Sequence, residues 1–340
     1  MTHIVFASDN GFVRQLTVAS SSAIYAMRNK SAAVSMHILD CGIAEEKWND
    51  YSSLLNRLAQ ENKVELHLER HTIDMNRIQN LQGWTNGSKA TWARILIPEL
   101  LPQVDTCIYS DCDILFIDDP SEMLKTLDDE KPLLIGHLNP LNKLSPDAKW
   151  HHQNNLPFDG NNYLCTGLVV MNLAAFRKEN LTEQCFEFAA RFPNTASVDQ
   201  TVLNNICRGR TATFQDAWEL FPYECYACPG ELKAIHFVGG FPWLKSISLF
   251  AAVLLNLSKK VCTIWYDFEE RILKLPHSHA IKQPLWLQIL ATLDALAYRL
   301  ADALKIKIPN RECWQEMISD YCKHTPAIDN ARRKLLSTSK

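Results

Sequence analysis

The sequence has no excess of basic residues: 35 lysines and arginines stand against 38 aspartates and glutamates in 340 residues, for a formal net charge of −3. Nucleic-acid-binding proteins generally carry a basic surface, so we expect no nucleic-acid partner, and we expect any anionic ligand to be held by local groups. Internal repeats and low-complexity tracts are also missing. Length and composition therefore predict one large globular domain with an appendage, or two domains.

The sequence also lacks a long apolar run. The longest mostly apolar stretch, residues 247–257, is about half as long as the roughly 20 residues that a membrane-spanning helix needs, and it predicts a buried or interfacial helix. The first residues, from Met1 to Ala7, lack the basic and apolar segments of a secretory signal. We therefore expect a cytoplasmic protein.

The eleven cysteines form no disulfide framework, because their number is odd and they are scattered from Cys41 to Cys322. They predict reduced and mostly buried side chains. Cys225 and Cys228 have the C-x-x-C spacing that can hold zinc or form a redox pair, but no second such pair accompanies them. We favour a structural role for both.

Strand-like and helix-like segments alternate along most of the chain. Short apolar runs that end in turn residues predict strands, and apolar periods of three to four residues predict helices. The alternation predicts an α/β fold with a doubly wound, mostly parallel, Rossmann-like sheet. We expect strands at residues 3–7, 34–40, 64–68, 106–110, 114–116, 132–136, 167–171 and 234–238, and helices at 14–27 and 45–60.

Ligands of open α/β sheets bind at the carboxyl ends of the strands. Asp9, Asp111 and His236 come at or near such ends, which makes them candidate site residues.

Two stretches without clear periodicity, 71–89 and 139–162, interrupt the alternation. Loops of that length are typical of lids and binding loops. The second stretch holds His151 and His152, which we expect in a solvent-exposed loop.

The composition shifts toward helix-forming apolar residues after Trp243, which predicts a domain boundary near Lys245 and a helical appendage over 246–340. Apolar residues recur there at three- and four-residue intervals and draw one stripe on a helix. The stripe favours either a helix packed on its own domain or an amphipathic helix on a membrane surface, and both interpretations stay open. It consists of Trp286, Ile289, Leu290, Leu293, Leu296, Leu300 and Leu304.

Asp111 and Asp113 form the motif most indicative of chemistry. They stand two positions apart between apolar runs, and side chains i and i+2 of an extended chain face the same side. Both carboxylates can therefore approach one hard divalent cation, which can in turn neutralise a diphosphate. Chance alone gives about one Asp-x-Asp in such a chain, but the apolar flanks make uncompensated carboxylates costly and so favour a bound cation.

Six motifs in one order resemble those of glycosyltransferase family 8, a retaining family that includes bacterial lipopolysaccharide galactosyl- and glucosyltransferases. The resemblance implies a GT-A-type nucleotide-sugar-binding catalytic domain over residues 1–245, followed by the appendage 246–340. The motifs are Ile4-Val-Phe-Ala-Ser-Asp9, Thr91-Trp-Ala-Arg94-Ile, Tyr109-Ser-Asp111-Cys-Asp113-Ile-Leu, Thr166-Gly-Leu-Val-Val-Met-Asn172-Leu, Asp199-Gln200-Thr-Val-Leu-Asn204 and His236-Phe-Val-Gly239-Gly-Phe-Pro-Trp243.

The resemblance implies a role for each matched residue. Asp111, Asp113 and His236 are the implied ligands of Mn²⁺, with Mg²⁺ as the alternative, and an oxygen-rich set with one imidazole suits Mn²⁺. Asp199 and Gln200 are the implied catalytic pair, with Asp199 on the hydroxyls of the transferred sugar and Gln200 facing its anomeric carbon. The implied contacts to a UDP-hexose donor come from Phe6, Ala7, Asp9, Arg94, Asp111, Cys112 and Gly239.

Several positions depart from the family pattern. Phe241 stands where the family has a lysine that holds the diphosphate, and a charge-assisted contact of that kind contributes about 1.5–3 kcal/mol. Lys245 is near enough in sequence to take its place at the donor. Cys165 replaces an asparagine, Thr201 an aspartate and Gly11 a polar residue, which leaves the donor open between glucose and galactose.

The implied reaction is the retaining transfer of a hexose from a UDP-sugar to a saccharide or glycolipid acceptor such as lipopolysaccharide core, at the cytoplasmic face of the inner membrane. Because the neutral amide of Gln200 is a poor nucleophile, we expect front-side attack by the acceptor hydroxyl. The departures also motivate a second class, a relative that binds nucleotide-sugar or glycan without turnover. A nucleotidyltransferase also uses paired aspartates, but the His236 motif disfavours it.

Overall fold

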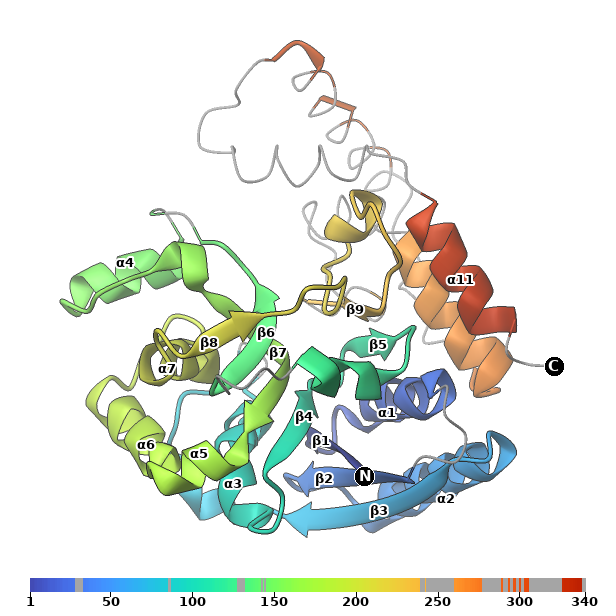
Figure 1. Ribbon diagram of the computed structural model, residues 1–340, viewed down its shortest axis with the longest axis horizontal. Helices are drawn as coiled ribbons and strands as arrows, with labels where there is room; N and C mark the ends of the chain where they lie inside the picture. The colour runs from blue at the N-terminus through green and yellow to red at the C-terminus, as the bar shows by residue number, and fades with distance from the viewer. Residues whose placement is uncertain are drawn as a thin grey trace. The chain divides into compact units, whose positions relative to one another are not determined.

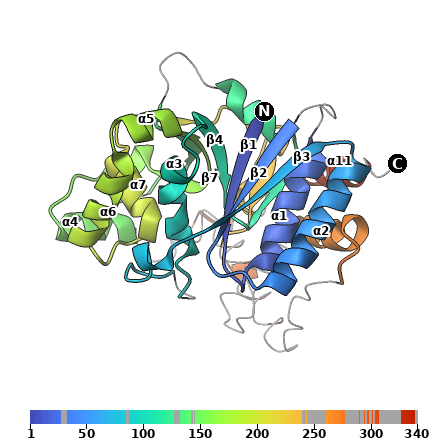
Figure 2. The ribbon, with the colours of Figure 1, turned by 90° about the horizontal axis from the view of Figure 1, so that it is seen from below.

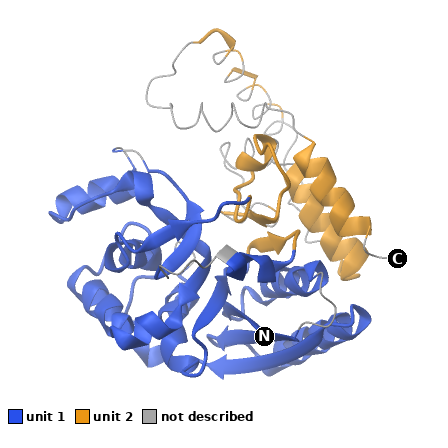
Figure 3. Cartoon of the chain, in the orientation of Figure 1, with its two compact units in different colours: residues 1–112, 119–216 blue, residues 113–118, 217–340 orange. Residues whose placement is uncertain are grey.

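The computed structural model describes residues 1–27, 33–84, 87–126, 132–141, 143, 145–238, 242, 260–276, 289, 293, 296–297, 300, 303–305 and 326–337. The predicted domain boundary at 245 lies outside these residues, as do Gly239, Phe241 and Lys245. The chain divides into two compact units, residues 1–112 with 119–216 and residues 113–118 with 217–340 (Figure 3). Each unit is therefore built from two separate segments of sequence.

The first unit is built around one seven-stranded sheet. Its strands are β1 (Thr2–Ser8), β2 (Ala33–Asp40), β3 (Glu65–Thr72), β4 (Thr106–Ser110), β6 (Leu134–Leu138), β7 (Leu164–Asn172) and β8 (Thr211–Thr213). They lie in the order β3-β2-β1-β4-β7-β6-β8 (Figure 1). The pairs β1–β2, β1–β4, β2–β3 and β6–β8 are parallel, whereas β7 is antiparallel to β4 and β6. The mostly parallel α/β fold predicted from the alternation is confirmed.

Helices cover both faces of this sheet (Figure 2). The helix α1 (Val13–Ala26) and the helix α2 (Glu45–Glu61) lie together on one side of β1, β2 and β3. The buried residues of α2 recur at three- and four-residue intervals, which gives the helix one apolar stripe toward the sheet. The other face is covered by η2 (Ala90–Leu96), α3 (Ile97–Leu100), α5 (Leu173–Lys178), α6 (Leu181–Arg191) and α7 (Val198–Ile206). Short helices elsewhere in the unit are η1 (Met75–Arg77), η3 (Pro120–Thr126) and η4 (Gly160–Asn162).

The stretch 139–162 contains a helix, α4 (Pro146–Gln153), where the sequence predicted an irregular loop. Ser145 caps it by accepting a hydrogen bond from the Ala148 N–H, and Pro146 occupies the first turn, where proline is well tolerated. The prediction of a solvent-exposed loop was therefore wrong for His151, which is buried in this helix with its Nδ1 2.7 Å from the Asp147 carbonyl oxygen. His152 is exposed. The capping signals at Ser145 and Pro146 determine the helix, although its apolar periodicity is weak.

The second unit holds a small antiparallel sheet of β5 (Ile114–Phe116) and β9 (Ala234–His236), in which Ile114 lies opposite His236. Its other elements include η5 (Glu224–Tyr226), η7 (Phe268–Ile272) and α11 (Ala327–Ser337). Every cysteine that the structure describes is free and buried, including Cys225 and Cys228, as the sequence predicted. Burial raises the pKa of the Cys225 thiol well above its usual value. Within the described part of the chain, no helix is both long and apolar enough to cross a bilayer.

A buried carboxylate joins α4 to the start of α7. Asp147 accepts hydrogen bonds from the Tyr163 hydroxyl at 2.6 Å, the Thr201 hydroxyl at 3.0 Å and the Ser197 hydroxyl at 2.7 Å. Thr201, which departs from the family pattern, thus has a structural partner inside the protein. Because Asp199 and Gln200 lie between Ser197 and Thr201, this network also fixes the turn that carries them.

We predict that Asp147→Ala lowers the free energy of unfolding by about 3 kcal/mol, because three hydroxyl donors, two of them buried, lose a charged acceptor. Urea unfolding followed by circular dichroism measures the loss. Asp105→Ala is the control, since Asp105 is 84% exposed and its ion pair with Arg177 contributes at most about 1 kcal/mol. A loss for Asp147→Ala no larger than the control's contradicts the role assigned to this network.

Candidate active site

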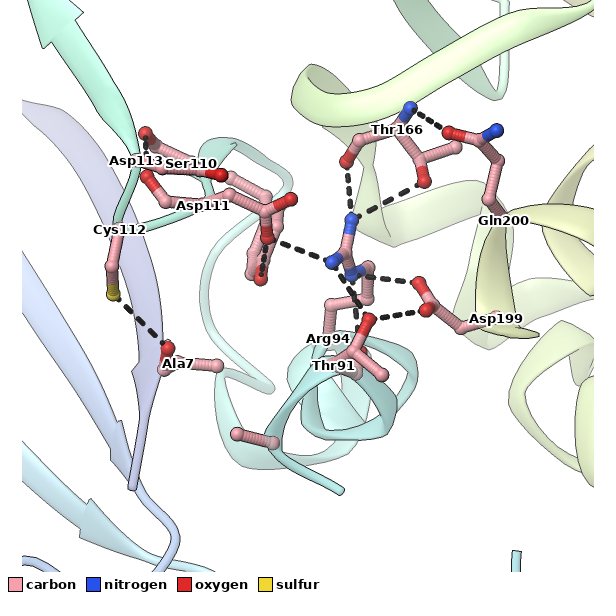
Figure 4. A network of polar contacts seen from close by, with 12 residues as sticks. Ala7, Thr91, Arg94, Ser110, Asp111, Cys112, Asp113, Thr166, Asp199 and Gln200 are labelled. Carbon is pink, nitrogen blue, oxygen red and sulfur yellow. Dashed lines mark hydrogen bonds and ion pairs between the residues drawn. The ribbon is translucent and has the colours of Figure 1, made fainter. Parts of the chain in front are cut away.

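A buried arginine lies at the centre of a polar network in the first unit (Figure 4). The side chain of Arg94 is 3% exposed, with Nη2 2.7 Å from Asp111 Oδ1 and Nε 2.9 Å from Asp199 Oδ2. Its Nη2 also donates to the Thr91 hydroxyl at 3.0 Å, and its Nη1 donates to the carbonyl oxygen of Thr166. One guanidinium thus joins η2 to α7, to β7 and to the chain directly after β4.

This network contains one cation, Arg94, and two carboxylates, Asp111 and Asp199. Burial opposes the charge on Arg94, but Asp111 and Asp199 outweigh it and raise the pKa of the guanidinium above its usual value. Burial also raises the pKa of Asp199, against the opposing effects of Arg94 and the Thr91 hydroxyl. Tyr109 contacts both charges: the centre of its ring lies 4.3 Å from the guanidinium carbon of Arg94, and its hydroxyl donates to Asp111 Oδ1 at 2.7 Å.

The end of β4 is held against its two neighbouring strands. The Asp111 N–H donates to the Gly167 carbonyl of β7 at 2.6 Å, and the buried Cys112 Sγ lies 3.2 Å from the Ala7 carbonyl oxygen of β1. Asp111 and Cys112 therefore belong to the carboxyl end of the sheet, as the sequence predicted for Asp111. This is the edge at which open α/β sheets bind ligands.

The end of β1 and the loop after it contain the other predicted donor contacts. The Phe6 side chain is fully buried and Ala7 has only a methyl group. Polar contacts from these two residues to a donor would therefore come from their backbone atoms. Asp9 accepts hydrogen bonds from the Gly11 N–H at 2.8 Å and from the Ser88 hydroxyl at 2.6 Å. Asp9 thus ties this loop to the segment that leads into η2.

Asp199 and Gln200 occupy the first turn of α7. Gln200 Oε1 accepts a hydrogen bond from the Thr166 N–H at 3.1 Å, while the buried Asp199 Oδ2 faces Arg94 Nε at 2.9 Å. Val198, just before the pair, has a φ of 49°, which is a strained value for a β-branched residue. Such strain is typical of functional sites, where the surroundings hold a residue in a sparsely populated conformation.

A carboxylate and an imidazole lie together in the second unit. Asp113 precedes β5, and its Oδ1 lies 3.2 Å from the Nε2 of His236 on β9. The Phe237 N–H donates to the Asp113 carbonyl oxygen at 2.8 Å, which fixes the backbone of Asp113 beside β9. Asp113 Oδ1 is buried and accepts no hydrogen bond from the part of the chain that the structure describes.

A third residue, Glu219, lies beside His236 and was not predicted from the sequence. It is fully buried, and its Oε1 lies 3.1 Å from His236 Nδ1. The Leu220 N–H and carbonyl pair with Ala234 and His236, which places Glu219 beside the histidine, and the φ of Glu219 is 60°. No motif marks Glu219 in the sequence, because the signal is its burial and its backbone conformation.

The donor set of Asp113 and His236 fits a divalent cation. A carboxylate on one imidazole nitrogen favours the tautomer with the proton on that nitrogen, which leaves the Nε2 lone pair of His236 facing Asp113. A carboxylate oxygen without a hydrogen-bond donor and an imidazole lone pair both need a positive partner. Asp111, the third predicted ligand, belongs to the first unit and stands two residues before Asp113.

Comparison with known proteins points to one family. The sequence profile of glycosyl transferase family 8 matches residues 3–246. A putative glycosyltransferase of Haemophilus influenzae is 22% identical over 290 residues, which cover 79% of this chain and 83% of the relative. General stress protein A of Bacillus subtilis is 24% identical over 230 residues, covering 65% of this chain and 74% of the relative.

Two solved structures share the fold. The galactosyltransferase LgtC, in complex with donor and acceptor sugar analogues, superposes with a TM-score of 0.60 at 20% identity, over 72% of this chain and 90% of that one. The bifunctional glycosyltransferase WbbM in its apo form superposes with a TM-score of 0.57 at 17% identity, over 71% of this chain and 46% of that one. At these identities the likeness establishes the fold, which has the GT-A-type architecture expected from the motifs.

We predict that Glu219→Gln weakens divalent-cation binding by about 10- to 100-fold, because an amide can donate to His236 Nδ1 and thereby stabilise the wrong tautomer. Calorimetric titration with Mn²⁺ measures the affinity. Glu224→Gln is the matched control, because Glu224 lies in the same unit and accepts a hydrogen bond from the Phe221 N–H. Equal Mn²⁺ affinity in the two variants contradicts the role of Glu219.

Proposed function

Because the chain belongs to glycosyl transferase family 8, we propose that this glycosyltransferase moves a hexose, galactose or glucose, from a UDP-sugar to a saccharide acceptor with retention of configuration. The observation that carries the proposal is the pairing of Asp113 with His236, backed by the buried Glu219. Such a pair binds a cation, and a cation beside a nucleotide-sugar site serves the diphosphate of the donor.

Asp111, Asp113 and His236 are the proposed ligands of Mn²⁺, with Mg²⁺ as the alternative. An imidazole among oxygen donors favours Mn²⁺, because Mg²⁺ binds mainly oxygen ligands and keeps several waters. When bound, the ion supplies positive charge to the diphosphate that leaves with UDP.

The buried carboxylate of Asp199 is proposed to bind the transferred sugar. The Thr91 hydroxyl donates to Asp199 Oδ1 and Arg94 Nε lies 2.9 Å from Oδ2, which leaves the remaining lone pairs of this buried carboxylate for a hydroxyl of the transferred sugar. A buried acceptor discriminates strongly against an analogue that lacks the matching hydroxyl. We therefore assign sugar recognition to Asp199, and we assign to Arg94 the task of holding Asp199 and Asp111 in place.

Gln200 lies against the transferred sugar without attacking it. The Thr166 N–H already engages Gln200 Oε1, the only oxygen with which this neutral amide could form a bond to the anomeric carbon. The acceptor hydroxyl attacks the anomeric carbon on the face from which UDP departs. A bond to the acceptor oxygen forms, the bond to the phosphate oxygen breaks, and the proton passes to the departing phosphate.

The remaining donor contacts follow the order of the motifs. Phe6, Ala7 and Asp9 surround the loop proposed to receive the uracil and ribose, and Cys112 lies at the end of β4 beside Ala7. Gly239 and Lys245 complete the proposed grip on the diphosphate from the part of the chain that the structure does not describe.

The acceptor is proposed to be a glycolipid such as lipopolysaccharide core, reached at the cytoplasmic face of the inner membrane. Five apolar side chains of the C-terminal stripe are exposed, from 51% for Ile289 and Leu296 to 61% for Leu300, with Leu293 and Leu304 between these values. Their spacing of three and four residues gathers them on one face of a helix, as in helices that lie on membrane surfaces.

We predict that the full chain releases UDP from UDP-galactose or UDP-glucose in the presence of Mn²⁺ and an oligosaccharide acceptor. Asp113→Asn and Gln200→Ala should each lower the rate by about 10²- to 10³-fold, because each removes a group that acts on developing charge. A coupled assay for UDP measures the rate.

Glu65→Gln is the control for this assay, since Glu65 is an exposed residue at the start of β3. Loss of UDP release with EDTA and its recovery with Mn²⁺ support the proposed metal. If the wild-type chain binds a UDP-sugar and never releases UDP, the proposal is overturned in favour of a non-catalytic binding protein.

We predict that the double exchange Leu293→Glu with Leu300→Glu reduces binding to vesicles of anionic phospholipid at least about tenfold, because two leucines can no longer enter the apolar layer. Sedimentation with the vesicles measures the bound fraction. Asn49→Glu with Asn56→Glu adds the same charge to exposed positions of α2 and is the matched control. Equal binding of both double variants would show that the stripe does not contact the membrane.

A further inference from the structure

Histidine and glutamate side chains gather on the face of the large sheet that points away from α2. Met36 and Arg70 contact α2 through Tyr51 and Trp48, so the odd-numbered residues of β2 and β3 point to the opposite side. In the strand register, His37 lies opposite Glu69, and His71 follows Glu69 two positions along the same face. None of these residues belongs to the active site described above.

Three donor atoms of this cluster lie within 4 Å of one another. His37 Nδ1 lies 3.1 Å from His71 Nε2, and Glu69 Oε2 lies 3.7 Å from the first nitrogen and 3.8 Å from the second. Ligands of a tetrahedral ion with bonds of about 2.0–2.1 Å are separated by about 3.3–3.4 Å, so shifts of a few tenths of an ångström bring all three into coordination. His37, Glu69 and His71 are also one of the groups whose donor atoms lie close enough to hold a metal ion.

A second layer of contacts orients these donors. The other nitrogen of His37, Nε2, lies 3.2 Å from the Ser35 hydroxyl and 3.0 Å from His3 Nδ1. The same Ser35 hydroxyl donates to Glu69 Oε1 at 3.1 Å, which leaves Oε2 directed toward the two histidines. Hydrogen bonds of this kind, to the far atoms of His37 and Glu69, are typical of metal sites, where they fix the ring and the carboxylate.

The two histidines are neutral at neutral pH, and the cluster is accessible to an ion from solvent. Burial lowers the pKa of His37 to about 4 and lowers that of His71, so both imidazoles are neutral at neutral pH, and a bound ion would replace the hydrogen bond between His37 Nδ1 and His71 Nε2. The Glu69 side chain is 52% exposed and His71 is 17% exposed, which gives an ion access from solvent and leaves space for a water ligand.

We propose that His37, Glu69 and His71 form a tetrahedral Zn²⁺ site on the outer strands of the sheet, with water as the fourth ligand. Two imidazoles, one carboxylate and a water at tetrahedral spacing suit Zn²⁺ better than Mg²⁺ or Ca²⁺, which need more oxygen ligands. Because β3 is the edge strand, the ion joins it to β2 through side chains as well as through the backbone ladder. This inference is independent of the proposed sugar transfer.

Zinc titration of the full chain tests the site, in a background of Asp113→Asn that disables the proposed manganese site. We expect one Zn²⁺ per chain, an upward shift of the melting temperature with Zn²⁺, and the visible absorption of tetrahedral Co²⁺ when cobalt replaces zinc. His71→Ala should weaken Zn²⁺ binding at least about a hundredfold, and Ser35→Ala about 10- to 100-fold. His71→Gln provides a second variant of the same ligand if the alanine variant does not fold.

His67→Ala is the matched control, because His67 lies four residues before His71 on the same strand and face, and contacts Glu65 at 3.2 Å. Its Zn²⁺ affinity should equal that of the background. The proposal is overturned if no Zn²⁺ binds to the background chain, or if the His71 variants and His67→Ala bind Zn²⁺ equally. Either result would show that His3, His37 and His71 form only a hydrogen-bonded row.

Discussion

The guanidinium of Arg94 meets two carboxylates in the interior of the first unit, and the geometry of the candidate active site depends on this contact. It joins Asp111, at the end of β4, to Asp199, on the first turn of α7. Removing one partner from a buried ion pair costs about 3–5 kcal/mol, because the remaining charge has no counter-charge. The elements that carry the proposed donor and sugar contacts are therefore coupled, and neither can shift alone without that cost.

The strands around the site could be predicted from the sequence, because each is an apolar run that ends at turn residues. β4 matches the predicted residues 106–110 and β5 the predicted 114–116. The helix α4 was missed because it is short and polar, and because its cap, Ser145, outweighs its weak periodicity. Its buried His151 shows why two adjacent histidines say little until the helix around them is known.

The chemistry of the site was less predictable than its strands. The order of motifs identified Asp113 and His236, which the structure brings together, but Glu219 has no motif and is recognised only by its burial beside His236. The cluster of His37, Glu69 and His71 was equally hidden, because the register between two strands decides which side chains meet across them. The strand β1 shows the reverse case, since Phe6 belongs to a matched motif yet its side chain is in the core.

The chain leaves the first unit after Cys112, contributes residues 113–118 to the second, and returns only for residues 119–216. A nascent chain emerges from the ribosome with its N-terminal part first, so all seven strands of the large sheet are synthesised before β9 exists. During that interval β5 lacks its partner strand β9, and Asp113 lacks the imidazole of His236. The pairing of Asp113 with His236 is thus a late event of biosynthesis. A product truncated after residue 216 would keep the strands of the large sheet and lack His236.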